Sequence, residues 1–470
     1  MMSGPRVGAI VTPVGRFSQG AFAGGCRVAR WGGRSGEGER MPHILVMGEA
    51  VTLTHVVRPT LLADALYAAG YGVTLACDPR FNALIGSRPY RTIALKSSID
   101  PATSTVLLKQ NQPLFSVETF NAYVREDVRL MRLAQPQLVV GDMRQSLAIS
   151  AQLTKVPYVN IINAHWSPSS DEPFALVDHP LHKVLGRETG DRLLSLLTPL
   201  GSMMMALPIN IAALNNGVAP IGAGLRETFC AGDYVVYPDI PELSPTRPLP
   251  PNHRYIGPLD FSPKIAPPPW WDKVPDDKPV IYVNLGSSGE PALLEVILAG
   301  LSDLRVTVIA ATAHPGAALA VPANAFIADY LPGDAAAANA ALVICNGGAS
   351  SGCQALVAGT PFLGIASNTD QLSYGTMVAK TGAAENLRED EVTAERVRET
   401  VARMLASPGY REAAQRLKQD FARYDAKANF VAFIGEILAA APIKALSSEV
   451  DAGPRKEDAS KQDSRAASVS

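Results

Sequence analysis

Short apolar runs alternate with longer stretches of helical period along most of the chain. Runs such as 43–47, 138–142 and 158–162 are mostly apolar and have the length of strands that are covered on both faces. Similar runs occupy 73–76, 233–237, 280–285, 306–310, 325–328, 341–345 and 362–365. Helical patterns lie between them, for example at 59–69 and 146–153. This alternation predicts parallel sheets covered by helices, which is an α/β fold.

A proline-rich passage interrupts the alternation and divides the chain. Ten prolines fall between 241 and 269, at 241, 245, 248, 250, 251, 258, 263, 267, 268 and 269. Proline cannot donate to a sheet ladder, so such a passage is typical of an extended linker. We expect a first α/β domain at 41–257, a linker at 258–279 and a second domain at 280–425. A last helix at 426–445 is expected to pack back on the first domain.

The two ends of the chain differ from the rest. Residues 1–40 hold six arginines, no lysine and many glycines, and their longest apolar run is too short for a secretory signal. We expect a disordered extension, or residues upstream of the true start at Met41; an Arg-rich transit peptide is the alternative. The polar, charge-mixed stretch 446–470 is expected to be a disordered tail.

Composition limits the classes of function. The 470 residues carry a net charge of −2 and are 47% hydrophobic, which allows large cores and gives no support to nucleic-acid binding. The five cysteines form no CxxC pair, so neither a disulfide framework nor a zinc site is indicated. We expect no metal and no cofactor, and a cytoplasmic location.

The stretch 341–371 carries the most specific pattern. A strand runs into the turn Asn346-Gly347-Gly348, a helix follows and ends near Gly359, and a second strand leads to Asp370-Gln371. A turn of this kind offers backbone N–H groups and the positive end of a helix to a phosphate. Two glycines alone more often form a plain tight turn, so the remaining elements decide the interpretation.

These elements resemble the donor-binding signature of nucleotide-sugar-dependent glycosyltransferases related to UDP-glucuronosyltransferases and macrolide glycosyltransferases. Gly347-Gly348, Ser351, Gly359-Thr360-Pro361 and Asp370-Gln371 follow in the order and spacing of that family. The resemblance covers roughly 41–440. It implies the GT-B fold, with two Rossmann-like parallel-sheet domains facing across an interdomain cleft and the donor on the C-terminal half.

Further donor residues follow from the resemblance. Gly286-Ser287-Ser288 is similar to the family's Gly-Ser loop beside the diphosphate, and Tyr330 stands where the family has an aromatic residue near the nucleobase. The chain departs from the family at Asn346, where a histidine is usual, and at Gln354, where a glutamate usually holds the ribose. An asparagine amide can donate to a phosphate oxygen but cannot carry a positive charge.

Transfer to a hydroxyl requires a base, and His55 follows the first strand closely and precedes Pro59, which is predicted to open a helix. The resemblance supports His55, because the family has a histidine and then a proline in this loop. Asp142 at the end of a strand is the candidate carboxylate behind it, with an N-cap role as the alternative. His165 and His179 are rivals that we expect to shape the acceptor pocket instead.

The acceptor is indicated only by composition. Residues 193–214 are mostly apolar with Met203-Met204-Met205 in the middle, and prolines and polar residues argue against a membrane span. We expect an inverting, metal-independent transferase that moves a sugar from a UDP- or dTDP-sugar to a hydroxyl of a small hydrophobic acceptor, of the kind found in bacterial secondary metabolism. The alternative is a sugar-nucleotide epimerase or a silent binding protein on the same fold. Peripheral membrane contact and the oligomeric state stay open.

Overall fold

The computed structural model describes residues 41–440, apart from 174, 175, 178, 263, 264, 287–290 and 313–318. Residues 1–40 form a unit separate from residues 41–470, and only the second unit is treated below. The expectations for 1–40 and 446–470 therefore lie outside the described residues, as do Ser287 and Ser288.

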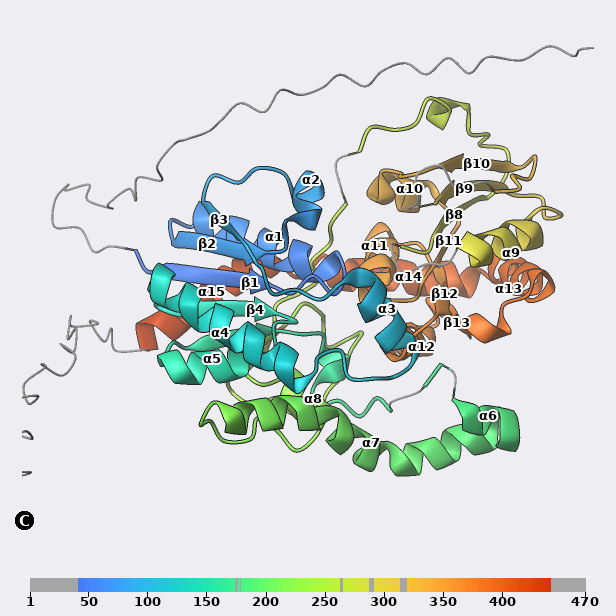
Figure 1. Ribbon diagram of the computed structural model, residues 1–470. Helices are drawn as coiled ribbons and strands as arrows, with labels where there is room; N and C mark the ends of the chain where they lie inside the picture. The colour runs from blue at the N-terminus through green and yellow to red at the C-terminus, as the bar shows by residue number, and fades with distance from the viewer. Residues whose placement is uncertain are drawn as a thin grey trace, which may run out of the picture. The chain divides into compact units, whose positions relative to one another are not determined.

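A seven-stranded parallel sheet forms the N-terminal half (Figure 1). Its strands are β1 (His43–Gly48), β2 (Gly72–Cys77), β3 (Arg91–Ala94), β4 (Leu138–Asp142), β5 (Tyr158–Ile161), β6 (Tyr234–Tyr237) and β7 (His253–Tyr255). Their order in the sheet is β3-β2-β1-β4-β5-β6-β7, so the direction of winding reverses between β1 and β4. Ligands of such sheets bind at the carboxyl ends of the strands beside this reversal.

Eight α-helices connect these strands within the described residues. They are α1 (Thr54–Ala68), α2 (Asn82–Ile85), α3 (Pro101–Lys109), α4 (Val117–Ala134), α5 (Leu147–Thr154), α6 (Pro180–Leu185), α7 (Arg187–Asn215) and α8 (Leu225–Phe229). The central strand β1 shows why both faces of the sheet need cover. Ile44 and Val46 pack in one buried cluster, whereas Leu45 and Met47 pack in another on the opposite face.

A six-stranded parallel sheet forms the C-terminal half and repeats the same winding. Its strands are β8 (Val280–Asn284), β9 (Thr307–Ala311), β10 (Ala325–Ala328), β11 (Leu342–Cys345), β12 (Phe362–Ala366) and β13 (Ala384–Arg388), in the order β10-β9-β8-β11-β12-β13. The helices are α9 (Pro291–Leu301), α10 (Gly333–Asn339), α11 (Ala349–Ala358), α12 (Thr369–Lys380), α13 (Ala394–Ala406), α14 (Pro408–Phe421) and α15 (Ala426–Ala440). Its reversal lies between β8 and β11, and the predicted α/β fold with two parallel sheets is confirmed.

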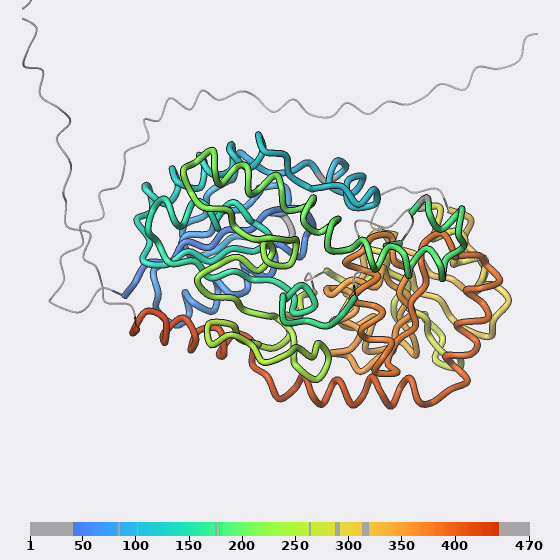
Figure 2. Tube along the Cα trace, turned by 90° about the horizontal axis from the view of Figure 1, so that it is seen from below, coloured from blue at the N-terminus to red at the C-terminus, as the bar shows by residue number. Residues whose placement is uncertain are grey.

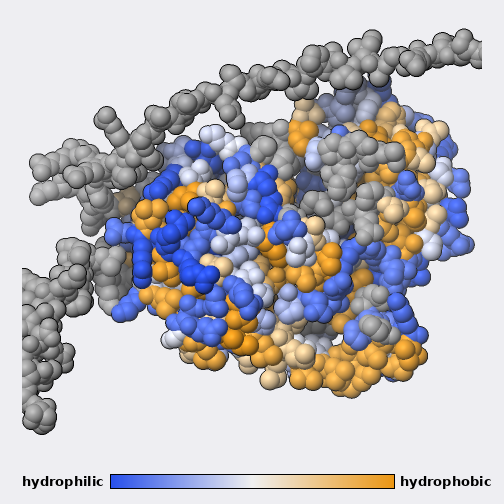
Figure 3. Space-filling view, in the orientation of Figure 1, coloured by the Kyte–Doolittle hydropathy of each residue, from blue (hydrophilic) through white to orange (hydrophobic). Residues whose placement is uncertain are grey.

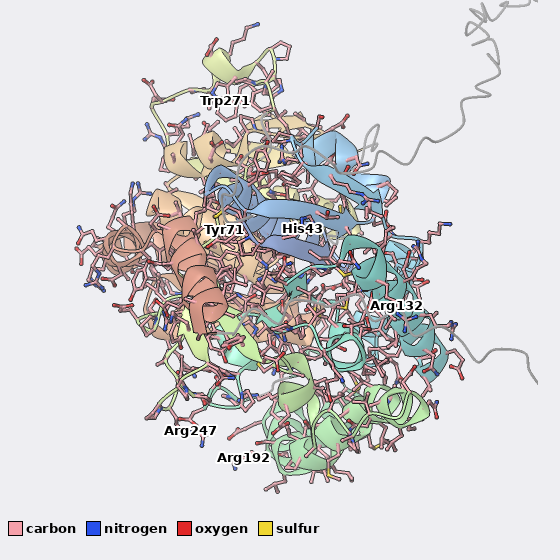
Figure 4. All side chains as sticks on the ribbon, turned by 90° about the vertical axis from the view of Figure 1, so that its left-hand side faces the viewer. His43, Tyr71, Arg132, Arg192, Arg247 and Trp271 are labelled. Atoms are coloured by element: carbon pink, nitrogen blue, oxygen red, sulfur yellow. The ribbon has the colours of Figure 1, made fainter. Side chains whose placement is uncertain are left out.

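The last helix, α15, belongs to the N-terminal core although it follows the C-terminal sheet in sequence. Phe430, Phe433, Ile434 and Ile437 are buried in the cluster that also contains Ile44 and Val46 of β1. Tyr71, between α1 and β2, lies beside α15 and packs against the same cluster (Figure 4). Figure 2 shows α14 and α15 (orange to red) following one another along one side of both halves.

One local prediction was wrong. The helix predicted at 59–69 begins at Thr54, so His55 lies in its first turn and not in a loop. Pro59 lies inside this helix, and its fixed φ suits a helical backbone. Because Pro59 has no N–H, the carbonyl of His55 does not receive the usual helical hydrogen bond. That carbonyl packs against Gly48, where any Cβ would come within 2.4 Å of it. The proline-rich passage contributes one strand, β7, and this strand lies at the edge of the sheet, in agreement with the expectation that the passage stays out of the sheet interior.

Candidate active site

A cavity with a volume of about 1190 Å³ lies where both sheets present the carboxyl ends of their strands. Residues following β1 line it from one side, and residues following β8, β11 and β12 line it from the other. Among the residues predicted from the sequence, the lining includes His55, Gly286, Tyr330, Asn346, Gly348, Ser351, Gln354, Asp370 and Gln371. The structure therefore brings these predicted donor residues and the predicted base into one space.

His55 and Asp142 form a hydrogen-bonded pair at the edge of the N-terminal sheet. His55 Nδ1 is 2.8 Å from Asp142 Oδ1, and the His55 side chain is 18% exposed whereas Asp142 is fully buried. We assign the proton between them to Nδ1, because a carboxylate oxygen can only accept. This leaves Nε2 as the ring nitrogen available to the cavity. Asp142 does not cap the following helix, whose N-cap is Ser146, so that alternative was wrong.

Arg58 is part of this pair and was missed in the sequence. Its Nε donates to Asp142 Oδ2 and its Nη2 to Asp142 Oδ1, both at 2.8 Å, and Nη1 donates to Asn163 Oδ1 at 2.7 Å. Nη2 also lies 3.1 Å from His55 Nδ1. The signal for Arg58 was its position three residues after His55, since residues three apart share one face of a helix.

Charge and burial act against each other at Asp142. Burial raises the pKa of the Asp142 carboxyl, but Arg58 and His55 lower it by a larger amount, so the pKa lies below its ordinary value. Asp142 is therefore ionised at neutral pH. At Asp239, which accepts from Asn163 and from the backbone of Ala164, burial dominates and raises the pKa.

A buried ionic network holds the loop that follows Asp142. Arg144 Nη1 donates to Glu49 Oε2 at 2.6 Å and Arg144 Nε donates to Asp127 Oδ1 at 3.0 Å, with all three side chains fully buried. Met143, between Asp142 and Arg144, has a φ of 56°, which is uncommon for a residue other than glycine. The network thus ties the ends of β1 and β4 together behind His55.

The turn between β11 and α11 has the geometry of an anion site. Gly348 is the N-cap of α11, and its N–H donates to Asn346 Oδ1 at 3.1 Å. Ser351 Oγ donates to the same amide oxygen at 2.6 Å. One backbone and one side-chain donor therefore converge on a single oxygen at the positive end of a helix.

Gly347 has a role different from the predicted one. It is not among the residues that line the cavity, and its N–H points to Cys345 Sγ at 3.4 Å. Its φ is 71°, and a Cβ there would lie 3.0 Å from Asn386 Oδ1. Gly347 shapes the turn, whereas Gly348 presents its N–H there.

Asp370 and Gln371 lie in the first turn of α12 and not at the end of a strand. Asp370 Oδ1 accepts from His165 Nε2 at 3.0 Å and from Trp166 Nε1 at 2.7 Å, both from the N-terminal half. Burial raises the pKa of Asp370, but these two donors and the charge of His165 lower it to about 2. The Gln371 side chain accepts from the N–H and the hydroxyl of Ser367.

The remaining predicted residues lie apart from this contact. Tyr330 is 47% exposed at the cavity wall, and Gln354 packs against Gly333 and reaches the carbonyl of Phe261 at 3.5 Å. His179 lines the cavity as expected, but His165 is bonded to Asp370. No group of three or more His, Cys, Asp or Glu side chains able to hold a metal occurs among the described residues.

The N-terminal wall of the cavity is apolar. Its members share large hydrophobic side chains and come from α3, α4, α7, α8 and the loops between them; they include Leu108, Leu114, Phe115, Phe120, Met143, Ile162, Leu194, Leu197, Met204, Met205, Ile209 and Phe229. The wall therefore suits a largely hydrophobic molecule.

Comparisons with known proteins agree on one class of enzyme. Residues 295–434 match the family described as Erythromycin biosynthesis protein CIII-like, C-terminal domain. A "PGL/p-HBAD biosynthesis glycosyltransferase" of Mycobacterium tuberculosis (strain ATCC 25177 / H37Ra) is 44% identical over 384 residues, which cover 81% of this chain and 89% of the relative. A "PGL/p-HBAD biosynthesis rhamnosyltransferase" of Mycobacterium bovis (strain BCG / Pasteur 1173P2) is 43% identical, with 82% and 85% covered.

Two solved structures share the fold at low sequence identity. The spinosyn rhamnosyltransferase SpnG, complexed with thymidine diphosphate, superposes with a TM-score of 0.60 at 19% identity and covers 85% of this chain and 100% of its own. The calicheamicin glycosyltransferase CalG4 gives a TM-score of 0.59 at 20% identity, covering 86% and 100%.

Proposed function

Because the chain belongs to the nucleotide-sugar-dependent glycosyltransferases with the GT-B fold, we propose that it transfers its sugar with inversion, without a metal ion, to a hydroxyl of a small hydrophobic acceptor. The single observation that carries this proposal is the position of the His55–Asp142 pair, which faces the same cavity as the turn at Gly348 and Ser351. A base and an anion site are thus available on opposite sides of one space.

His55 acts as the general base in this mechanism. Its Nε2 takes the proton of the acceptor hydroxyl while that oxygen forms a bond to the anomeric carbon of the donor. The bond from that carbon to the diphosphate breaks, and its electron pair leaves with the diphosphate. Asp142 holds Nδ1–H and stabilises the imidazolium that forms. Attack opposite to the leaving group inverts the anomeric carbon.

The leaving diphosphate is stabilised by fixed donors. The N–H of Gly348 and the hydroxyl of Ser351 now converge on Asn346 Oδ1, and we propose that a phosphate oxygen takes the place of that amide oxygen. The positive end of α11 then supplies the electrostatic stabilisation that a metal supplies in other transferases. Asp370 and Gln371 are proposed to contact the sugar hydroxyls, and Tyr330 to stack on the base.

The apolar wall supports a hydrophobic acceptor. Phe115, Phe120, Met205 and Phe229 lie on the same side of the cavity as His55, so a ring system or chain placed there would present a hydroxyl near the base. A sugar acceptor would instead place its polar hydroxyl groups against these apolar side chains, and burying hydroxyl groups without hydrogen-bond partners lowers the affinity.

The test uses purified enzyme, UDP- and dTDP-sugars and a panel of hydrophobic alcohols and phenols. Nucleoside diphosphate should appear only when an acceptor is present, and the product should have the anomeric configuration opposite to that of the donor. A chelator should not lower the rate. Isomerised donor without transfer would favour the epimerase, and donor binding without any reaction would favour the silent binding protein.

Two substitutions test the assigned roles in the same assay. His55→Ala should reduce kcat by about 100-fold or more, the usual contribution of a general base. His253→Ala is the matched control, because its ring bonds to Tyr237 and does not line the cavity. Equal rates for wild type and His55→Ala would remove His55 as the base.

A further inference from the structure

The outer face of α7 is an apolar surface that the described part of the fold does not cover. Its exposed side chains are Leu193, Leu196, Leu197, Leu200, Met203, Met204, Leu207, Ile211 and Leu214, and we call them the α7 stripe. They recur at spacings of three and four and so lie along one face of the helix. Figure 3 shows this hydrophobic surface along the lower edge of the molecule, over α6 and α7.

The opposite face of α7 has a partner in the C-terminal part of the helix, from Ala206 onward. Ile209, Ala212 and Ala213 are buried in a cluster with Phe120 and Tyr123 of α4. By length and composition alone α7 could cross a membrane, but this packing fixes it to the N-terminal domain as a surface helix. The stripe therefore faces outward on a folded protein, where contiguous apolar surface of this extent marks an interaction site.

The chemistry of the stripe favours lipid over protein. From Leu193 to Leu225 the chain has no charged and no aromatic residue. Protein interfaces are enriched in aromatic and arginine anchors and have a polar rim. The charges at the start of α7 are also occupied, since Asp191 pairs with Arg388 and Arg187 bonds to Asp390.

The stripe continues into the acceptor cavity. Leu197, Leu200 and Met204 are exposed on the helix and also line the cavity, whereas Leu196, which is 79% exposed, does not line it. A hydrophobic acceptor dissolved in a lipid layer that touches the stripe could pass along these three side chains without entering water. The cavity mouth and the apolar surface thus form one continuous path.

We propose that the α7 stripe docks the enzyme on a lipid bilayer surface, with α7 lying in the plane of the interface, so that the acceptor enters the cavity from the bilayer. This rests on the proposed function, because it takes the acceptor to be lipophilic. Binding comes from apolar burial and not from charge, so it tolerates high salt and needs no anionic lipid.

Co-sedimentation of the full chain with phosphatidylcholine vesicles tests the docking without any reaction. The triple variant Leu196→Ser, Met203→Ser, Leu207→Ser changes side chains that do not line the cavity. It should weaken vesicle binding by about 100-fold in total, because each lost apolar side chain weakens binding by roughly tenfold or less. The matched control is Leu133→Ser, Leu153→Ser, Val321→Ser, which removes three exposed apolar side chains elsewhere, 41–54% exposed, and should bind like wild type. The single variant Leu196→Lys repeats the test with less disturbance to folding.

The outcomes separate docking from catalysis. Failure of the wild-type chain to sediment with vesicles, equal binding by the triple variant, or a dimer in ultracentrifugation that the triple variant abolishes would each overturn the docking. The triple variant should also lose turnover of an acceptor embedded in vesicles while it keeps turnover of a short, water-soluble one. Vesicle binding without transfer to any acceptor would instead overturn the proposed function and leave the docking in place.

Discussion

The buried pair of Arg58 and Asp142 allows a quantitative test of the catalytic site. Asp142 is fully buried and the Arg58 side chain is 5% exposed, so neither charge has water as an alternative partner. Asp142→Asn keeps the shape of the side chain but removes its charge and turns an amide donor toward the donors of Arg58 or His55. Arg58→Met removes the cation and leaves Asp142 with His55 as its remaining side-chain partner among the contacts above.

Each single substitution therefore leaves one buried charge without its opposite. Breaking a buried ion pair in this way costs about 3–5 kcal/mol. The double variant removes both charges, and replacing a buried pair by neutral groups is often close to neutral, although Asn163 then loses the bond from Arg58 Nη1, worth about 1 kcal/mol. We expect the double variant to be more stable than either single variant, with a coupling energy of about 3 kcal/mol or more.

Urea unfolding of the four proteins measures this cycle, followed by fluorescence and circular dichroism. The slope m must agree among them, because a change in m would mean that a different amount of structure unfolds. Turnover provides the second measurement. The double variant should recover stability but stay as slow as Asp142→Asn, since the carboxylate behind His55 is still missing. Additive losses of stability, within about 0.5 kcal/mol, would refute the buried-charge argument.

Three further predictions concern the C-terminal side of the cavity. The pKa of Asp370 is about 2 in the folded chain and about 3.9 in an unfolded one, so its contribution to stability is complete above about pH 5 and is lost progressively as the pH falls to about 1. Melting temperatures of wild type and Asp370→Asn should therefore converge on acidification, and a constant difference would contradict this. Gly347→Ala should lower the free energy of unfolding by about 1 kcal/mol or more, and the melting temperature with it, because the φ of 71° at Gly347 is unfavourable for a residue with a Cβ. Gly348→Ala, with a φ of −79° and a Cβ no closer than 3.4 Å to its neighbours, should melt like wild type. Tyr330→Ala should raise KM for the donor by about 5- to 100-fold with little change in kcat if the ring stacks on the base, and Tyr330→Phe should restore it.

Strands made of apolar residues could be predicted from the sequence, including the half-buried β10, whereas partly exposed strands with charged or polar residues could not. β1, β4 and β11 are short runs that are apolar on both faces of the strand, whereas a helix of the same length would need apolar residues on one face only. β3, β7 and β13 are partly exposed strands that carry residues such as Arg91, His253 and Glu385, so their composition resembles that of loops. Their positions depend on the neighbouring strand and not on their own pattern.

Some residues of the candidate site could also be predicted from the sequence, and others could not. His55 and Asp142 could be paired in advance because each stands close after a strand or at its end, beside the winding reversal. Arg58 could not be predicted to be buried, since arginine is rarely buried unless a partner is present, and that partner comes from 84 residues further along the chain. The contact of Asp370 with His165 and Trp166 joins the two halves, and the sequence of either half alone does not indicate it.

The return of α15 to the N-terminal core affects how chimeric enzymes could be built from this chain. A single crossover in the 258–279 passage would place a foreign α15 against Tyr71 and the residues around Ile44, where Phe430 and Phe433 now fit. A hybrid with a new donor half should therefore need a second crossover between Phe421 and Ala426, so that the native α15 stays with its own sheet. The N-terminal half is therefore discontinuous in sequence.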